Sequence, residues 1–143
     1  MFKNILVPIH LEYKKNHEKL LLGALSVLDK ENGKISLFNV NENSAHPGIY
    51  ARLDDNTQEE YKQGALERLK EIAEQYSLPM DKLSLIVKSG SVHQEILKEA
   101  EKMKVDAIVM MATKPGLSSY FISSTAERVI RHAHCSVFII RLD

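Results

Sequence analysis

The sequence has little of three features that would point to particular classes of protein. It contains one cysteine, Cys135, so no disulfide can form within the chain. Its 19 Lys and Arg residues balance 19 Asp and Glu residues, which argues against a field that attracts nucleic acid or an anionic membrane surface. No apolar run approaches the roughly 18 to 20 residues that a membrane span needs, and the N-terminal run is too short for a signal peptide. We therefore expect a cytoplasmic protein that binds any anion locally.

The composition indicates an ordinary globular chain with its own core. Of the 143 residues, 44% are hydrophobic and 27% are charged, and this length fits one domain over residues 1–143. Five apolar runs are rich in Ile, Val, Leu and Phe and are mostly unbroken, as expected for parallel strands that are covered on both faces. These runs occupy residues 3–9, 34–40, 82–87, 106–111 and 136–142.

Segments with helical spacing lie between the apolar runs. Their apolar stripes are centred on residues 20–28, 61–76, 92–103 and 126–133. Strict alternation of strands and helices predicts a doubly wound, five-stranded parallel sheet with helices on both faces. We expect the strand order 3-2-1-4-5, and the pattern alone leaves the order 2-1-3-4-5 open.

The expected strand order places a ligand site between the first and fourth strands. Open sheets of this kind bind ligands beyond the carboxyl ends of the strands, at the point where the strand order reverses. There, His10 would meet the segment after Met111. Eleven residues separate Met111 from Ser123, which is more than a tight turn needs, and they include Thr113 and Lys114. A loop of this length with hydroxyl and basic groups can wrap a phosphate chain.

The start of the last helix has two interpretations. Residues Ser124 to Glu127 match the S-x-x-E capping box, in which the serine accepts a hydrogen bond from the third amide and the glutamate reaches back to the first. The remaining amides at a helix start attract anions, so the same junction could hold a phosphate. The residues alone support an ordinary cap and an anion site about equally.

Four stretches together resemble the universal stress protein family over essentially the whole chain. They are NILVPI at residues 4–9, SGSV at 89–92, VDAIVMMATKP at 105–115 and SSTAERVIRHAHCSVFIIR at 123–141. The resemblance implies the adenine nucleotide alpha hydrolase-like fold and a role in the response to stress. Some members of that family bind ATP and others do not.

The resemblance also implies where an adenine nucleotide would bind. In nucleotide-binding members, the loop after the fourth strand carries G-x2-G-x9-G-[ST], and here Met111, Lys114 and Ser123 stand where the glycines would be. His10 stands where the family has an aspartate, and Val40 where it makes a backbone contact. We expect weak binding of ATP or another adenine nucleotide; the alternative is a member that acts only through protein contacts. The implied nucleotide-binding residues are Pro8, Ile9, His10, Val40, Met111, Thr113, Lys114, Ser123, Ser124 and Thr125.

The sequence offers little support for catalysis or for a metal. The motifs G-x-S-x-G, H-E-x-x-H and G-x4-G-K-[ST] are absent, so we expect no enzyme. A small phosphotransfer or flavin-type enzyme on a similar sheet is a third reading, but Ile9 and His10 stand where a response regulator needs acidic residues. The cluster of His132, His134 and Cys135 lacks the paired outlying ligands of a structural zinc site, so we expect no metal.

The last strand is expected to lie at an edge of the sheet. A long apolar edge strand is an aggregation hazard unless something covers it. Members of the family that the chain resembles commonly dimerise by pairing their last strands, which implies a homodimer through this segment. The residues concerned are Val137, Phe138, Ile139, Ile140, Arg141 and Leu142.

Overall fold

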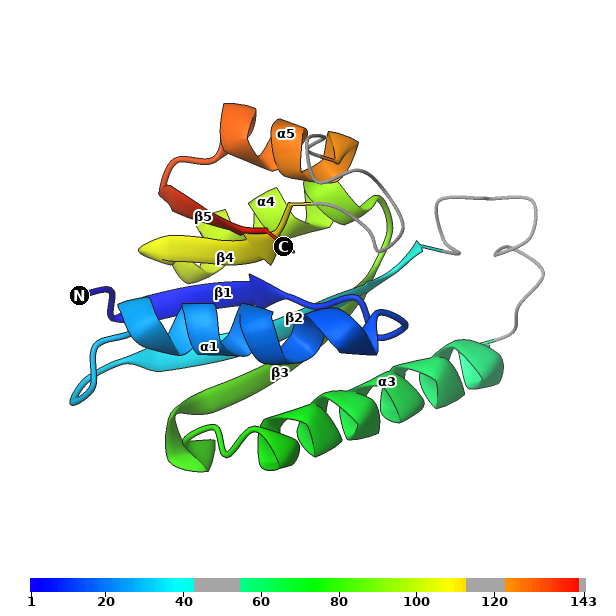
Figure 1. Ribbon diagram of the computed structural model, residues 1–143. Coiled ribbons are helices and arrows are strands. Elements are labelled where there is room, and N and C mark those ends of the chain that lie inside the picture. Colours follow the sequence, from blue (N-terminus) through cyan, green and yellow to red (C-terminus); the bar gives the residue numbers. More distant parts are fainter. Residues whose placement is uncertain (43–54, 113–122, 142–143) are drawn as a thin grey trace.

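The computed structural model describes residues 1–42, 55–112 and 123–141. Within these ranges five parallel strands form one sheet with the order β3-β2-β1-β4-β5, so the expected order is confirmed and the alternative is excluded (Figure 1). The five apolar runs are all strands, and their ends lie within two residues of the expected ones. The strands are β1 (Asn4–Pro8), β2 (Lys34–Asn41), β3 (Leu83–Ser89), β4 (Ala107–Met111) and β5 (Ser136–Ile140).

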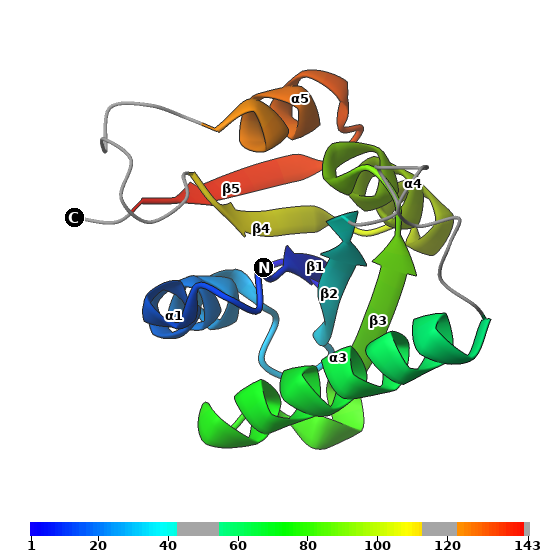
Figure 2. The same ribbon diagram turned by 90° about the vertical axis from the view of Figure 1, so that its right-hand side faces the viewer.

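Helices cover both faces of the sheet (Figures 1 and 2). Helices α1 and α3 lie on one face, and helices α4 and α5 lie on the other. The α-helices are α1 (His17–Val27), α3 (Asp55–Gln75), α4 (Val92–Met103) and α5 (Ser124–His132), and the short 3-10 helices are η1 (Lys14–Asn16) and η3 (Met80–Lys82).

Strand β1 shows why the strands read as unbroken apolar runs. Ile5 and Val7 are fully buried against the side of α1 and α3, whereas Leu6 is fully buried against the side of α4 and α5. Because successive side chains of a strand point to opposite faces, a strand covered on both sides needs an apolar residue at every position. The two resulting cores hold the sheet rigidly between its helices.

Strands β1 and β4 part before they reach their carboxyl ends. The β1–β2 pairing continues to Pro8 and Phe38, but the β1–β4 pairing comprises only Ile5 with Ala107 and Leu6 with Ile108. Pro8 has no backbone N–H and cannot donate to a neighbouring strand. The next residue, Ile9, donates its N–H to the Phe38 carbonyl at 2.7 Å, so the chain leaves β1 along β2. This parting creates the crevice expected at the reversal of strand order.

Strand β5 forms one edge of the sheet, as expected. Apart from exposed Ser136, its side chains are half-buried, and Phe138 packs edge to face on Phe2 with ring centroids 5.2 Å apart. Leu142, the last residue of the expected dimer contact, lies outside the described residues. The dimer itself stays a prediction.

Candidate functional site

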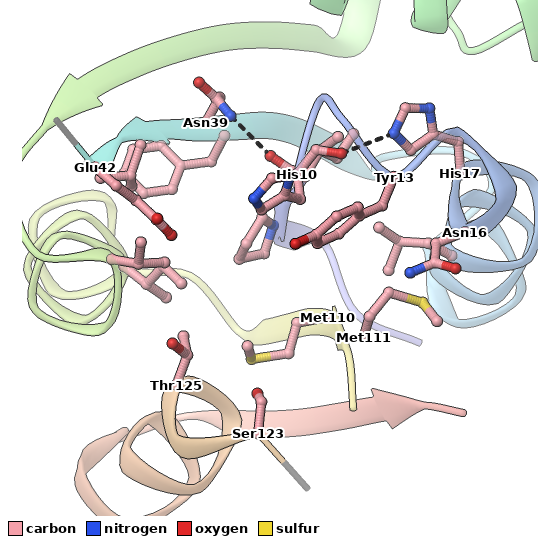
Figure 3. Close-up of a pocket in the computed structure, with 17 residues that line it drawn as sticks. His10, Tyr13, Asn16, His17, Asn39, Glu42, Met110, Met111, Ser123 and Thr125 are labelled. Carbon is pink, nitrogen blue, oxygen red and sulfur yellow. Dashed lines mark hydrogen bonds between the residues drawn. The ribbon is translucent and has the colours of Figure 1, made fainter. Parts of the chain in front are cut away.

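A pocket opens where β1 and β4 part (Figure 3). Its cavity volume is about 120 Å³, and its walls come from the ends of β1, β2 and β4 and the starts of α1, α4 and α5. Ser124 is exposed and does not line the pocket, and Thr113 and Lys114 lie outside the described residues. The expected site residues that line it are Pro8, Ile9, His10, Val40, Met111, Ser123 and Thr125.

The wall at the end of β1 is fixed by hydrogen bonds. The side-chain amide nitrogen of Asn39 donates to the Ile9 carbonyl at 3.0 Å, and this bond ties the exit of β1 to β2. The imidazole Nε2 of buried His17 lies 3.0 Å from the His10 carbonyl, so Nε2 carries the proton and donates to it. Both bonds use side chains that face the strand end, and they hold the backbone around His10 in one arrangement.

Two aromatic rings stand in this wall. The imidazole of His10 stacks on the phenol ring of Tyr13, with ring centroids 3.9 Å apart and 13° between the ring planes. Tyr13 reaches this position because its N–H donates to the His10 carbonyl at 3.2 Å, which closes a tight turn. The stacked pair occupies space at the centre of the crevice (Figure 3). It presents an aromatic surface where the family pattern would have a carboxylate.

The opposite wall is the start of α5, and here the expected cap is wrong by one residue. Ser123, not Ser124, is the N-cap, and its side-chain oxygen accepts from the Ala126 N–H at 3.1 Å. The Ser123 N–H donates to the Ala112 carbonyl at 2.7 Å, which keeps Ser123 extended at the end of β4. Glu127 does not reach back to the cap; its carboxylate binds Arg131 at 2.9 Å. The S-x-x-E pattern is therefore present without the capping box.

The cap leaves two backbone amides at this wall. Ser123 satisfies the Ala126 amide, but no described residue accepts a hydrogen bond from the N–H of Ser124 or of Thr125. Unpaired amides in the first turn of a helix carry the positive end of its dipole and favour an anion. An anion site at this junction would need amides of this kind.

Charge at the pocket is sparse. Among the described lining residues no lysine or arginine occurs, and Glu42 is the one carboxylate. An anion in the pocket would therefore depend on the helix start, since the described walls supply no cationic side chain that pairs with phosphate directly.

Several lining residues were missed in the sequence analysis. The most informative are Tyr13, Asn16, His17 and Asn39. A sequence signal for Asn39 was available, because it interrupts an apolar strand that is expected to be covered on both faces, and a polar residue buried there needs a hydrogen-bond partner. The others follow β1 by a few residues and carry no motif, so only the turn formed by η1 brings them to the pocket.

Neither metal ligation nor membrane spanning is indicated in the part of the chain that the structure describes. Residues 1–42, 55–112 and 123–141 contain no group of three or more His, Cys, Asp or Glu side chains that could hold a metal ion. None of the helices described there is both long and apolar enough to cross a membrane.

Comparison with known proteins decides the family. The sequence pattern of the Universal stress protein family matches residues 1–141. The chain belongs to the universal stress protein family. It is 27% identical over 143 residues to Universal stress protein G of Escherichia coli O157:H7. The alignment covers 99% of this chain and all of that protein.

Solved structures agree with this assignment at the level of the fold. The structure of the protein MJ0577 superposes on the whole of this chain over 98% of its own length, with a TM-score of 0.80 and 22% sequence identity. A universal stress protein in complex with cAMP superposes on 97% of this chain over 96% of its own length, with a TM-score of 0.59 and 15% sequence identity. The fold is the adenine nucleotide alpha hydrolase-like fold of this family.

Proposed function

We propose that this protein is a regulatory binding module of the stress response that binds an adenine nucleotide weakly in the pocket between β1 and β4. We further propose that it is not an enzyme and that it works in the cytoplasm as a homodimer. The observation that carries the nucleotide proposal is the crevice itself. It lies at the reversal of strand order, and Ser123 and Thr125 at the start of α5 border it, where two backbone amides have no acceptor among the described residues. A distant relative with the same fold was crystallised with cAMP, an adenine nucleotide.

Weak binding follows from what the pocket lacks. Met111 stands where the family has a glycine, and a side chain there obstructs close approach of the backbone to a phosphate. The cavity of about 120 Å³ is smaller than the roughly 300 to 1,000 Å³ typical of ligand pockets. One part of a nucleotide would enter the cavity while the rest lies at its mouth, beside Thr125.

A second candidate function is action through protein contacts alone. The small cavity and the absence of lysine and arginine from its described walls favour it. In this case the stacked rings of His10 and Tyr13 would be a permanent filling of the crevice rather than a wall of a binding site.

Calorimetry with ATP, ADP, AMP and cAMP separates the two candidates. We expect dissociation constants between about 10 μM and 1 mM, which correspond to roughly 4 to 7 kcal/mol of binding free energy. A constant well below about 10 μM would show that the missing glycines do not weaken nucleotide binding. No heat of binding at millimolar nucleotide would favour the role in protein contacts.

A further inference from the structure

Two buried side-chain atoms in the described residues have no hydrogen-bond partner, and both belong to the pocket. They are the amide oxygens of Asn16, which is 3% exposed, and of Asn39, which is 7% exposed. Buried polar atoms are satisfied almost everywhere in native proteins, so an exception calls for an explanation. That both exceptions line the same pocket points to a ligand as the missing partner.

Asn16 is the more informative of the two. The Asn39 amide nitrogen already binds the Ile9 carbonyl, so that side chain has a structural use. Asn16 occupies the N-cap position of α1, but its side chain makes no capping hydrogen bond, and no described protein atom pairs with its amide. Its backbone N–H, which donates to the Tyr13 carbonyl at 3.0 Å, would be kept by another residue. Within the described residues the amide therefore makes no contact that stabilises the fold.

The position of Asn16 in the pocket suggests which part of a ligand it would meet. Figure 3 shows Asn16 on the α1 side, whereas Ser123 and Thr125 lie across the pocket at the start of α5. Phosphates suit the α5 side, because the backbone amides without a described acceptor are there. A phosphate near Asn16 would leave the amide oxygen unpaired, since a phosphate diester or a fully ionised phosphate has no donor.

We propose that the Asn16 amide hydrogen-bonds the base of the bound adenine nucleotide; this inference rests on the function proposed above. The adenine edge presents the exocyclic amine next to a ring nitrogen, which places a donor beside an acceptor. A side-chain amide matches this pair with its own acceptor and donor, as asparagine does when it reads adenine in DNA. Binding would then give a partner to the Asn16 amide oxygen, which the protein alone leaves without one.

A comparison of two ligands in two proteins tests the contact directly. The ligands are ATP and purine riboside triphosphate, which lacks the exocyclic amine, and the proteins are the wild type and Asn16→Leu. We expect the wild type to prefer ATP by roughly 10-fold or more and the variant to bind both ligands alike. Asn16→Ala serves as a second variant if the leucine proves too large for the site.

Thermal unfolding without ligand separates a binding role from a structural one. Asn16→Leu removes a buried amide oxygen that has no partner, so its Tm should equal or exceed that of the wild type. The matched control is Asn4→Leu, because the Asn4 amide donates to the Met103 carbonyl at 3.0 Å at the other end of β1. This control should lower the Tm while leaving the preference for ATP intact.

The outcomes distinguish this inference from the proposed function. If the wild type binds ATP and Asn16→Leu keeps the same preference for it, the inference is wrong and the proposed function stands. A lower Tm with unchanged ATP preference would assign the amide to the free protein, which also overturns the inference. If the wild type binds no nucleotide, the proposed function fails and takes the base contact with it.

Discussion

The imidazole of His10 stacks on the ring of Tyr13 at a centroid distance of 3.9 Å. This pair occupies the position at which the family pattern places an acidic acceptor. A neutral imidazole offers one donor and one acceptor in a geometry unlike that of a carboxylate. At the β1 end of the pocket, the presence of His10 in place of the family's aspartate is therefore the difference with the clearest chemical consequence.

Replacing His10 by aspartate should tighten nucleotide binding. A charged acceptor contributes about 1.5 to 3 kcal/mol per hydrogen bond, which would lower the dissociation constant for ATP by roughly 10-fold to 150-fold. Calorimetry on His10→Asp measures the change. The control is His10→Leu, which also removes the stack on Tyr13 but adds no acceptor. Equal affinities in the two variants would show that the side chain at this position does not contact the ligand.

The two serines at the start of α5 should differ in their effect on stability. Ser123→Ala removes the hydrogen bond to the Ala126 amide and should lower the free energy of unfolding by about 1 kcal/mol. Ser124→Ala alters an exposed residue and should change it by less than about 0.5 kcal/mol. Urea unfolding of both variants provides the measurement. The opposite ranking would restore Ser124 as the cap.

A proline at the β5 edge should prevent dimer formation. The Ser136 N–H donates to the Asp106 carbonyl, and the Ile140 carbonyl accepts from the Ala112 N–H, so the backbone groups of these two residues face β4. Because backbone groups alternate in direction along a strand, the Ile139 N–H points to the open edge. Ile139→Pro removes that donor without breaking the pairing with β4. Light scattering should give the monomer mass of 16.2 kDa for this variant and twice that mass for the wild type.

Ile139→Ala is the matched control for the proline, because it shortens the same side chain and keeps the N–H. It should remain dimeric. A single substitution is preferable to removing the strand, since the contact of Phe138 with Phe2 belongs to the core. A dimeric Ile139→Pro would move the interface to another surface.

His93 should make stability depend on pH. Burial, followed by the charges of Arg128 and His132, lowers the pKa of His93 below its ordinary value of 6.5. The folded protein therefore binds fewer protons at this site than the unfolded chain, and stability falls as the pH drops from about 6.5 through the lowered pKa. Between pH 8 and pH 5, the Tm of His93→Gln should decline less than that of the wild type. Parallel declines would show that His93 is not the group responsible.

The sheet was predictable because its signals are local. Each strand is covered on both faces, and β1 and β4 therefore read as unbroken apolar runs without knowledge of their neighbours. The strand order needed more. The pattern favoured 3-2-1-4-5 but left 2-1-3-4-5 open, and the pairing of β1 with β4 in the structure excludes the second order.

The details of the site depended on contacts between distant segments. Either Ser123 or Ser124 could cap α5, and the choice was settled by the Ala112 carbonyl, which holds Ser123 at the end of β4. The unpaired amide of Asn16 could not be foreseen, because a side chain lacks a partner only once the surrounding elements have assembled. Sequence patterns thus located the pocket but not the groups that distinguish it.

The strands on either side of the crevice are fastened at one end only. Near the amino ends, the Asp106 carboxylate accepts from the N–H groups of Lys3 and Asn4, at 3.1 and 3.0 Å, beside the two paired positions of β1 and β4. Beyond Leu6 no ladder bond joins the halves of the sheet. Beyond Leu6, a ligand between β1 and β4 therefore meets side chains rather than strand pairings, and it would enter by displacing those side chains while the pairings of β1 with β2 and of β4 with β5 persist.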